Sequence, residues 1–472
     1  MTNVLFIIHD NYQDSNQFPL GPAYLASVLE QNGYTVEVYC MDVFHYTNDD
    51  LANKLKKDTY DLIGLDFMAA RYTETIVDLC KVINKHKGNA KFILGGHGPS
   101  PIPIYMLMKT NADIVAIGEA EETIIDVMKY IHGLMPIDDV KGIAYRDNNH
   151  IHITQKRELI KKLDTIPFPA WHLFPMDKYT TSTRTGWMEK DERYIAIITS
   201  RGCINTCTFC ARLTEGIRLR NLNKVIEEMK VLEKEYGVTC FNISDELFLI
   251  SKKRALKFCE LLKENNMKIK FSAGARADVL DEETAIALKE AGCGILSVGF
   301  ESSSQDSLDY MKKNTTVEDN IRTLEISRKV GLPVALNFIW GYPTDTYEIL
   351  MDNVKIINEY NQFKQLRTIR PVTPYPGCEL YYEAIFKGLL QGPDDFFTKF
   401  KNSDLITVNF TRYSDKQCYE WLFEANKKLI EYHYEHTDMT REECDDLINQ
   451  FYNLYFKGFY KFRGARRYET KR

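Results

Sequence analysis

The stretch IITSRGCINTCTFCAR, residues 197–212, decides the fold of this 472-residue chain. It starts as an apolar, β-branched run typical of a buried strand and continues into a loop that carries Cys203, Cys207 and Cys210. The cysteines are separated by three and then by two residues. Thiolate sulfurs bind the corners of an iron–sulfur cubane. Three ligands on one loop therefore predict a [4Fe–4S] cluster whose fourth iron is open to a small bidentate ligand.

A structural zinc site is the alternative for these cysteines. Closed zinc sites have four protein ligands and often combine two separated CxxC pairs, whereas this sequence has no second pair. The other eight cysteines are scattered singly, and an odd total without a secretory signal indicates reduced thiols rather than a disulfide framework. We expect most of them to fill the core: Cys40, Cys80, Cys240, Cys259, Cys293, Cys378, Cys418 and Cys444.

Around the cysteine loop, strand-like and helical segments alternate from residue 191 to residue 391. This alternation predicts a partial (β/α)6 barrel, whose active-site residues lie where its parallel strands end. The six strand candidates are residues 194–200, 239–244, 268–273, 295–300, 333–339 and 366–371.

A second alternation occupies residues 1–135 and predicts a doubly wound, Rossmann-like parallel sheet. Its strand candidates are residues 4–8, 35–39, 62–67, 91–96 and 113–118. Ligands of such sheets bind beyond the carboxyl ends of the strands, so the important loops begin at His9, Asp66, Gly95 and Gly118.

The rest of the chain divides into two regions. Residues 136–190 contain several prolines and predict a linker, with a hairpin candidate in GIAYRDNNHIHIT. Residues 392–472 are aromatic and predict a helical region, with residues 419–436 as its clearest amphipathic segment.

Composition narrows the function classes. The net charge of −6 gives no overall field toward nucleic acid or an anionic membrane. No apolar run is long enough to span a bilayer, and the N-terminal apolar run lacks the preceding basic region of a signal peptide. We expect a cytoplasmic protein without a membrane partner, with a small-molecule or peptide-like substrate.

The cysteine loop resembles that of the radical S-adenosylmethionine (SAM) superfamily, whose pattern CxxxCx-aromatic-C is met by Cys203, Cys207, Phe209 and Cys210. The resemblance implies that the open iron binds the amino and carboxylate groups of SAM. An electron, from a donor such as flavodoxin or ferredoxin, then cleaves the C–S bond. The resulting 5′-deoxyadenosyl radical removes a hydrogen atom from the substrate.

The same resemblance suggests further SAM contacts. Phe209 would lie against the adenine, and either Asp245 or Glu246, after the second strand, would face the ammonium group. The adjacent carboxylates leave that choice open. Arg276, beyond the third strand, could form a two-pronged hydrogen bond with the SAM carboxylate.

Two later strands add candidates for the same cofactor. Glu301 would reach the ribose hydroxyls or the amine. Asn337 is a candidate polar contact, and Gly341 permits close approach of the backbone to adenine or ribose.

The N-terminal segments resemble the cobalamin-binding domain that precedes the barrel in one class of radical enzymes. The likeness is carried by FPLGPAYLASVLEQNGY, FILGGHGPS and ADIVAIGEAEETI. With ESSSQDSLDYMKK and TPYPGCELY of the barrel, it covers residues 1–390.

Two neighbouring loops are the candidate cobalamin contacts. The glycines of the first could admit the flat edge or nucleotide tail of a large cofactor. The first loop consists of Gly95, Gly96, His97 and Gly98, and the second contains Gly118 and Glu119.

The cobalt-coordinating motif DxHxxG is absent from the sequence. A non-histidine side chain or water is therefore expected at the lower cobalt face. The candidate loop is formed by Phe67, Met68 and Arg71.

The leading functional hypothesis is cobalamin-dependent methyl transfer to an unactivated carbon. The alternative enzyme class uses the radical for dehydration, rearrangement or ring formation, with cobalamin silent or absent. A methylthiotransferase acting on tRNA or protein would need three N-terminal cysteines, and only Cys40 and Cys80 precede the linker. Its nucleic-acid contact would have to come from the basic tail, residues 456–472. A cobalamin-binding sensor with a decayed barrel is disfavoured by the intact cysteine triplet.

Overall fold

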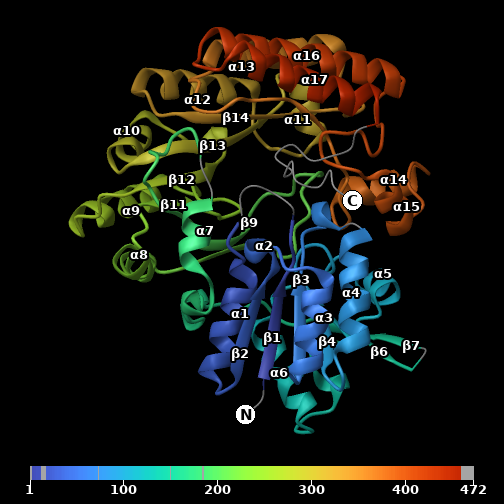
Figure 1. Cartoon of the computed structure of the whole chain (residues 1–472). Helices are drawn as coiled ribbons and strands as arrows, with labels where there is room; N and C mark the ends of the chain where they lie inside the picture. Colours follow the sequence, from blue (N-terminus) through green and yellow to red (C-terminus); the bar gives the residue numbers. More distant parts are fainter. Residues whose placement is uncertain (1–2, 12–16, 73, 149, 183–184, 459–472) are drawn as a thin grey trace.

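The computed structural model describes residues 3–11, 17–72, 74–148, 150–182 and 185–458. It contains two open sheets with their surrounding helices, one in the N-terminal third of the chain and one in the barrel (Figure 1). Most of the basic tail lies outside the described residues. None of the described helices combines the length and the apolar character needed to cross a membrane.

The N-terminal sheet has the strand order β2-β1-β3-β4-β5-β6-β7, and its first five strands are parallel. Both faces are buried, because alternate residues of each strand pack on opposite helical layers. Leu5 and Ile7 face α3, α4 and α5, whereas Val4 and Phe6 face α1 and α6. The strands are β1 (Asn3–Ile8), β2 (Thr35–Cys40), β3 (Leu62–Asp66), β4 (Lys91–Gly95) and β5 (Ile114–Ala116). The helices are α1 (Leu20–Gln31), α2 (Met41–Phe44), α3 (Asn48–Lys57), α4 (Glu74–His86), α5 (Pro103–Thr110) and α6 (Glu121–Ile131).

The hairpin expected within the linker belongs to this sheet. β6 (Ile143–Asp147) pairs antiparallel with β5, and β7 (His150–Ile153) pairs antiparallel with β6. The N-terminal sheet therefore extends beyond residue 135, where the sequence analysis ended the domain. Charged residues around the hairpin gave it the composition of a linker, although Ile143, Ala144 and Tyr145 are buried.

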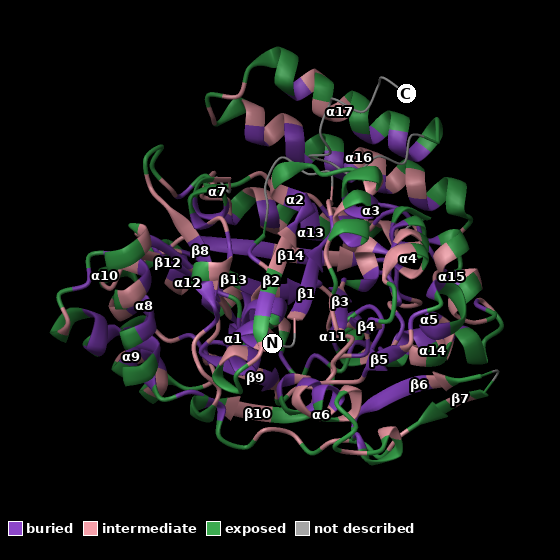
Figure 2. Cartoon of the chain, turned by 60° about the horizontal axis from the view of Figure 1, so that its bottom comes forward, coloured by how far each residue is buried: buried purple, intermediate pink, exposed green. Residues whose placement is uncertain are grey.

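The second sheet is the expected open barrel of six parallel strands, in the order β15-β14-β13-β12-β11-β8. Its outward side chains, such as Phe241 and Phe271, pack under the helices, and Figure 2 shows the strands largely buried and the outer helix faces exposed. The strands are β8 (Tyr194–Ile197), β11 (Cys240–Ile243), β12 (Lys270–Ala275), β13 (Cys293–Glu301), β14 (Val334–Trp340) and β15 (Arg370–Pro371). The helices are α7 (Met176–Ser182), α8 (Leu222–Tyr236), α9 (Lys252–Glu264), α10 (Glu282–Glu290), α11 (Gln305–Tyr310), α12 (Val317–Val330) and α13 (Tyr347–Tyr360).

The helical C-terminal region supports the barrel and joins it to the N-terminal domain. Asn426 on α16 exchanges hydrogen bonds with both backbone groups of Ile369 and so covers the edge next to β15. Phe397 on α15 packs against Tyr72 of the N-terminal domain, with ring centroids 4.3 Å apart. Trp421 on α16 is partly buried and packs against the buried Trp340. The helices are α14 (Glu379–Phe386), α15 (Pro393–Lys399), α16 (Asp415–Glu435) and α17 (Arg441–Phe456).

An apolar layer closes the barrel interior at the amino ends of its strands. Trp187 packs there with Cys240, Ile295 and Ala335. Gly294 makes room for the indole, since a Cβ atom at this glycine would lie 2.4 Å from Cε3 of Trp187. The barrel interior is therefore accessible from the carboxyl ends of the strands.

We predict that Gly294→Ala lowers the free energy of unfolding by about 1–3 kcal/mol, the usual cost of overpacking a core. Urea titration followed by circular dichroism measures the change. Gly21→Ala is the matched control, because its new methyl group would meet nothing closer than 3.8 Å. Equal unfolding midpoints for Gly294→Ala and the unmodified chain would show that the packing of the Trp187 indole does not require a glycine at position 294.

Candidate functional site

The cysteine loop begins at the end of a short hairpin that the sequence analysis did not predict. β9 (Ser200–Cys203) pairs antiparallel with β10 (Gly216–Leu219), so that Cys203 lies opposite Gly216. Gly202 has a φ of +85°, and a Cβ atom there would lie 2.3 Å from the Gly216 carbonyl oxygen. Only glycine fits this position, and the hairpin therefore fixes where the cysteine loop leaves the sheet.

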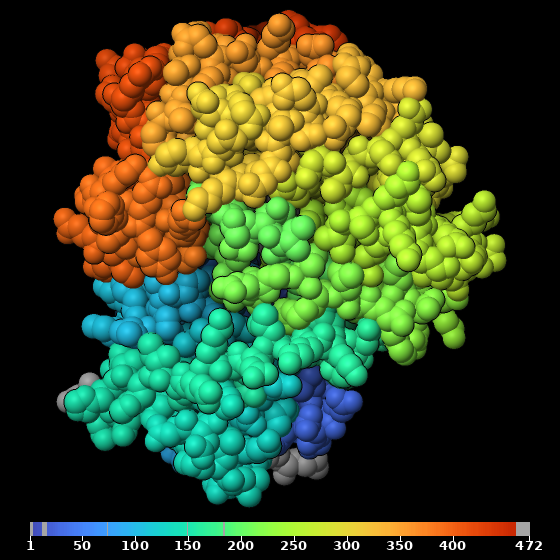
Figure 3. All heavy atoms as spheres, turned by 180° about the vertical axis from the view of Figure 1, so that it is seen from behind, coloured from blue at the N-terminus to red at the C-terminus, as the bar shows by residue number. Residues whose placement is uncertain are grey.

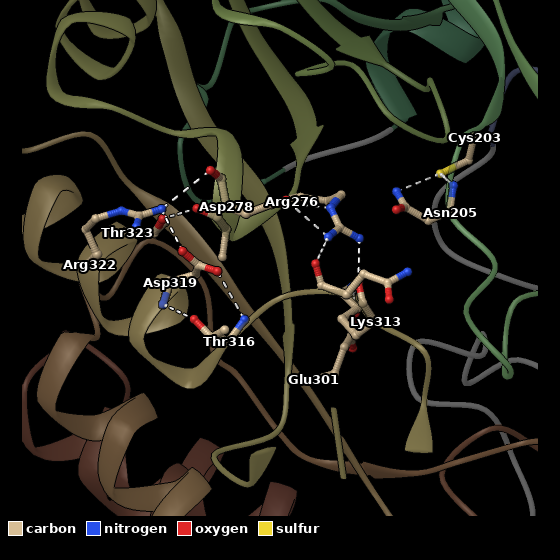
Figure 4. Close-up of polar contacts among 12 residues, drawn as sticks. Cys203, Asn205, Arg276, Asp278, Glu301, Lys313, Thr316, Asp319, Arg322 and Thr323 are labelled. Carbon is tan, nitrogen blue, oxygen red and sulfur yellow. Dashed lines mark hydrogen bonds and ion pairs between the residues drawn. The ribbon is translucent and has the colours of Figure 1, made fainter. Parts of the chain in front are cut away.

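The three cysteines of the loop are free and are not deeply buried. The backbone N–H and the side-chain Nδ2 of Asn205 each lie 3.4 Å from the Cys203 sulfur (Figure 4). Burial, together with the nearby Cys207, raises the pKa of Cys210 to about 11. Their thiols therefore lie within electrostatic reach of one another.

The loop is also held from outside. Thr208 donates its N–H to the Met311 carbonyl at 2.9 Å and accepts from the Leu380 N–H at 2.8 Å. The described residues contain no three His, Cys, Asp or Glu side chains that already converge as a metal-ligand set. The all-sulfur donor set on one anchored loop nevertheless fits an iron–sulfur cluster, because thiolates are the ligands that such clusters prefer.

The two adjacent carboxylates after β11 have different environments. Asp245 is buried and accepts hydrogen bonds from the backbone and hydroxyl groups of Thr199 and Ser200. Burial raises the pKa of Asp245, and these hydrogen bonds oppose that rise. Glu246 is exposed, has no hydrogen bond or ion pair within the described chain, and lies within electrostatic reach of Cys210. Asp245 braces the start of the hairpin, which leaves Glu246 as the carboxylate available to a ligand.

Arg276 has protein partners for most of its N–H groups. Its Nε and Nη2 atoms bind the Asp278 carboxylate at 2.9 and 3.2 Å. Its Nη1 and Nη2 atoms also donate to the carbonyls of Lys313 and Asn314 at 2.6 and 2.7 Å (Figure 4). The two-pronged hydrogen bond expected with the SAM carboxylate is thus formed with the Asp278 carboxylate. In this arrangement, Arg276 fixes the loop after α11.

Glu301 is buried and forms an ion pair with Lys313, a residue that the sequence analysis did not select. The Lys313 Nζ lies 2.7 Å from Glu301 Oε1 and 5.9 Å from the centre of the Phe209 ring. Gly299 leaves room for the pair, since a Cβ atom there would lie 2.4 Å from Glu301 Oε1. Lys313 lies within ESSSQDSLDYMKK, but two consecutive lysines in a sequence usually indicate a solvated turn.

Asn337 and Gly341 lie on one strand and the turn that follows it. Asn337 faces the barrel interior, where its Nδ2 donates to Ser297 Oγ at 3.0 Å. Gly341 has a φ of +116°, and its N–H donates to Asp345 Oδ2 at 2.8 Å. This hydrogen bond stabilises the turn from within. The contact of Gly341 with a cofactor stays a prediction.

The glycine loop after β4 differs from the expectation in one respect. Gly96 has a φ of +89°, and Cβ atoms at Gly96 and Gly98 would crowd Phe67 at 3.1 and 2.7 Å. These two glycines allow the β3 and β4 loops to pack together, so the space they leave is filled by protein. Gly95 and Gly118 have no atom within 4 Å of the corresponding position and border open space.

Other side chains at this edge of the sheet are compatible with a polar cofactor. Met68 and His97 are exposed. His9 is buried, and its Nδ1 atom has no hydrogen-bond partner within the described chain. Burial lowers the pKa of His9 to about 4 and keeps its imidazole neutral at pH 7. An amide-rich cofactor such as cobalamin fits this edge, because its groups could satisfy the unpaired nitrogen.

Glu119, unlike the neighbouring Gly118, does not face open space, because its side chain binds other protein side chains. It accepts from Arg201 at 3.1 Å and from Arg218 at 2.7 Å, while Arg201 also binds Glu121. All four side chains are largely buried, and Arg201 and Arg218 face each other across the β9–β10 hairpin. Burial raises the pKa of Glu119, but the two arginines outweigh this effect and lower it overall. We call this four-residue network the interdomain clamp, because it ties the β5 loop to the hairpin that carries Cys203.

A cavity of about 440 Å³ lies where the N-terminal domain, the cysteine loop, the barrel mouth and the C-terminal region meet. Seen from behind, the cysteine-loop segment lies between the N-terminal domain and the rest of the barrel (Figure 3). The cavity is lined by Ala70, Arg71, Phe209, Ile339, Arg370, Pro371, Val372, Thr373, Tyr375, Ser403 and Asp404. The candidate site thus lies between the carboxyl ends of two parallel sheets.

Two family models match the chain. The radical SAM superfamily matches residues 197–357, and the B12 binding domain matches residues 14–128. A protein of Pyrococcus horikoshii, named as an uncharacterized methyltransferase, is 30% identical over 382 residues, which are 79% of each chain. The anaerobic magnesium-protoporphyrin IX monomethyl ester cyclase of Rubrivivax gelatinosus is 28% identical, over 80% of this chain and 69% of the cyclase.

The fold is similar to that of a solved structure with both cofactors. The cobalamin-dependent SAM radical enzyme OxsB, with aqua-cobalamin and SAM bound, aligns with a TM-score of 0.67 and 20% identity. The alignment covers 88% of this chain but only 58% of OxsB. This likeness concerns the arrangement of the two domains, and the chain spans little more than half the length of OxsB.

We predict that Arg201→Met destabilises the protein by about 3–5 kcal/mol, because Glu121 would remain buried without its partner and Glu119 would keep only Arg218. It should also lower the iron content after anaerobic reconstitution, since β9 positions Cys203. Urea titration and iron analysis measure the two effects. Lys252→Met, which removes two exposed ion pairs, is the control and should change neither the stability nor the iron content. Unchanged stability and iron content in Arg201→Met would contradict a structural role for the interdomain clamp.

Proposed function

Because the chain belongs to the radical SAM enzymes that carry a cobalamin-binding domain, we propose that it is a methyltransferase acting on a carbon atom of a small-molecule or peptide-like substrate. The observation that carries this proposal is the shared cavity between the cysteine loop and the carboxyl edge of the N-terminal sheet. Methyl transfer requires a radical source and a methyl donor within reach of one substrate. A cavity bordered by Phe209 on one side and Arg71 on the other meets that requirement.

The chain supplies a holder for each group. Cys203, Cys207 and Cys210 would hold the [4Fe–4S] cluster, and the open edge at Gly95 and Gly118 would receive cobalamin. With both groups bound, SAM cleavage supplies the 5′-deoxyadenosyl radical and cobalamin supplies the methyl group. An electron donor such as flavodoxin or ferredoxin is required, which favours the cytoplasm.

The protein side chains bind and orient SAM in this proposal. Glu246 faces the ammonium group, because it is the carboxylate near Cys210 without a protein partner in the described chain. Phe209 offers its ring to the adenine, and the Glu301–Lys313 ion pair lies beside that ring. Asp245 and Arg276 act through other residues: the first holds the hairpin and the second holds the loop that carries Lys313.

A second candidate is a radical reaction without methyl transfer. Its support is the similarity to the Rubrivivax gelatinosus cyclase, which covers most of this chain at nearly the same identity as the methyltransferase relative. A methylthiotransferase would need three N-terminal cysteines for a second cluster, whereas Cys40 and Cys80, the two that precede the linker, are buried on separate elements of the N-terminal domain.

The first test of this proposal follows the methyl group without requiring the substrate. Anaerobic protein loaded with iron, sulfide and reduced cobalamin is mixed with methyl-labelled SAM, and the bound cobalamin is analysed by mass spectrometry. We expect stoichiometric label on the cobalamin. Label that stays entirely on SAM, in protein shown to bind cobalamin, would favour the cyclase-like class.

The second test separates the two adjacent carboxylates. Glu246→Gln should weaken SAM binding about 10-fold and leave stability unchanged, since it removes one charge-assisted contact near 1.5 kcal/mol. Asp245→Asn should lower the free energy of unfolding instead, because an amide cannot accept from all four donors. Equilibrium binding of SAM and urea titration distinguish the two effects. The reverse pattern would assign the ligand contact to Asp245.

A further inference from the structure

The barrel interior is polar below its mouth. Ser272 Oγ donates to Asn242 Oδ1 at 2.9 Å, and Asn337 Nδ2 donates to Ser297 Oγ at 3.0 Å. These side chains come from four neighbouring strands, β11 to β14, and face the inside of the sheet. An interior built only for stability would be apolar, as it is in the layer around Trp187.

Arg367 brings a positive charge to this polar region. Its Nη1 donates to Asn337 Oδ1 at 3.3 Å, and its Nη2 donates to Gln365 Oε1 at 2.9 Å. Both partners are neutral amides, and no carboxylate of the described chain forms an ion pair with this guanidinium. Burial lowers the pKa of Arg367 to about 10, although an arginine remains charged at pH 7.

Several other arginines near the site have acidic partners, whereas Arg254 donates to the carbonyls of Thr199 and Arg220. Arg201 and Arg218 bind glutamates of the interdomain clamp, and Arg276 binds Asp278. Arg370, three residues after Arg367, forms an ion pair with Asp404 at 3.0 Å. A buried charge is unfavourable unless it is paired, so the absence of an acidic partner for Arg367 within the described chain indicates that the partner comes from a ligand.

The depth of Arg367 distinguishes it from the residues near the cluster. Ile339 lines the cavity beside Phe209, and Asn337 lies two residues earlier on the same face of β14. At about 3.3 Å per residue, Asn337 and its partner Arg367 lie about 7 Å deeper than Ile339. A group bound at Arg367 would therefore lie below the cysteine loop, and the rest of the molecule would extend upward to the mouth.

We propose, on the basis of the proposed function, that the substrate carries an anionic group, a carboxylate or a phosphoryl group, which binds Arg367 in the barrel interior. Asn337 and Ser297 provide neutral hydrogen-bonding groups beside it. The planar guanidinium can bind two oxygens of either anion at once. The apolar layer around Trp187 closes the far end, so the anion fixes how far the substrate enters and which carbon faces the mouth.

The proposal is tested by anion binding to the full-length protein loaded with cluster and cobalamin. Isothermal titration at constant ionic strength uses inorganic phosphate and acetate as probes, which distinguish a phosphoryl from a carboxylate preference. We expect saturable binding of at least one probe. Arg367→Gln should weaken that binding at least 10-fold, whereas Arg367→Lys should retain part of it.

Arg146→Gln is the matched control for the loss of a guanidinium. Arg146 lies on β6 of the N-terminal sheet, outside the barrel, and is partly buried. Like Arg367, it donates to a neutral group, the Leu107 carbonyl. Its variant should bind the probes like the unmodified protein. If neither probe binds saturably, or if Arg367→Gln binds as tightly as the unmodified protein, the proposal is wrong.

The outcome is independent of the methyl-transfer test. Transfer of label from SAM to cobalamin needs no substrate, so Arg367→Gln should retain it. Anion binding that depends on Arg367 without any label transfer would overturn the methyltransferase proposal alone. Label transfer without such anion binding would overturn the anionic substrate alone.

Discussion

The interdomain clamp is the interaction on which the arrangement of the site depends. Arg201 and Arg218 lie on the two strands of the β9–β10 hairpin, and Glu119 and Glu121 follow the last parallel strand of the N-terminal sheet. Breaking a buried pair of this kind by removing one partner is costly, because the remaining charge stays away from water. The clamp therefore fixes the hairpin that carries Cys203 relative to the edge of the other sheet.

This geometry gives a physical reason for joining two parallel α/β sheets. Each sheet offers a binding edge at the carboxyl ends of its strands. With the two edges facing one cavity, groups held by either domain can reach one substrate. Phe397 and Asp394 on α15 add a second bridge, through Tyr72 and Lys109 of the N-terminal domain. Two separated bridges resist the rocking that a single contact would permit.

The sequence predicts the strands well, because they depend on local patterns, and the three cysteines stay a prediction that also depends on one local pattern. Buried parallel strands are short apolar runs, and the spacing of the three cysteines is a property of one loop. All five parallel strands of the N-terminal sheet and all six of the barrel lie where the periodicity indicates them. The β9–β10 hairpin was missed, since SRGC and GIRL are too polar and too short to suggest strands.

The side-chain roles were harder to predict, because they depend on contacts between distant segments. The sequence suggests Glu119 as a ligand contact, whereas in the fold it binds two arginines that lie 82 and 99 residues away along the chain. Gly96 looked like a cofactor cradle, although the space it leaves is filled by Phe67. Lys313 and Arg367 have no distinguishing local pattern, and only the fold shows the first near the Phe209 ring and the second beside Asn337.

The most direct test of the account is the magnetic interaction between the two cofactors in one protein molecule. Anaerobic protein loaded with cob(II)alamin and a reduced [4Fe–4S] cluster would be examined by electron paramagnetic resonance and compared with protein that carries either group alone. The account predicts spin coupling in the doubly loaded protein, because Phe209 of the cysteine loop and Arg71 of the N-terminal domain border one cavity of about 440 Å³. A spectrum equal to the sum of the two singly loaded spectra would contradict it.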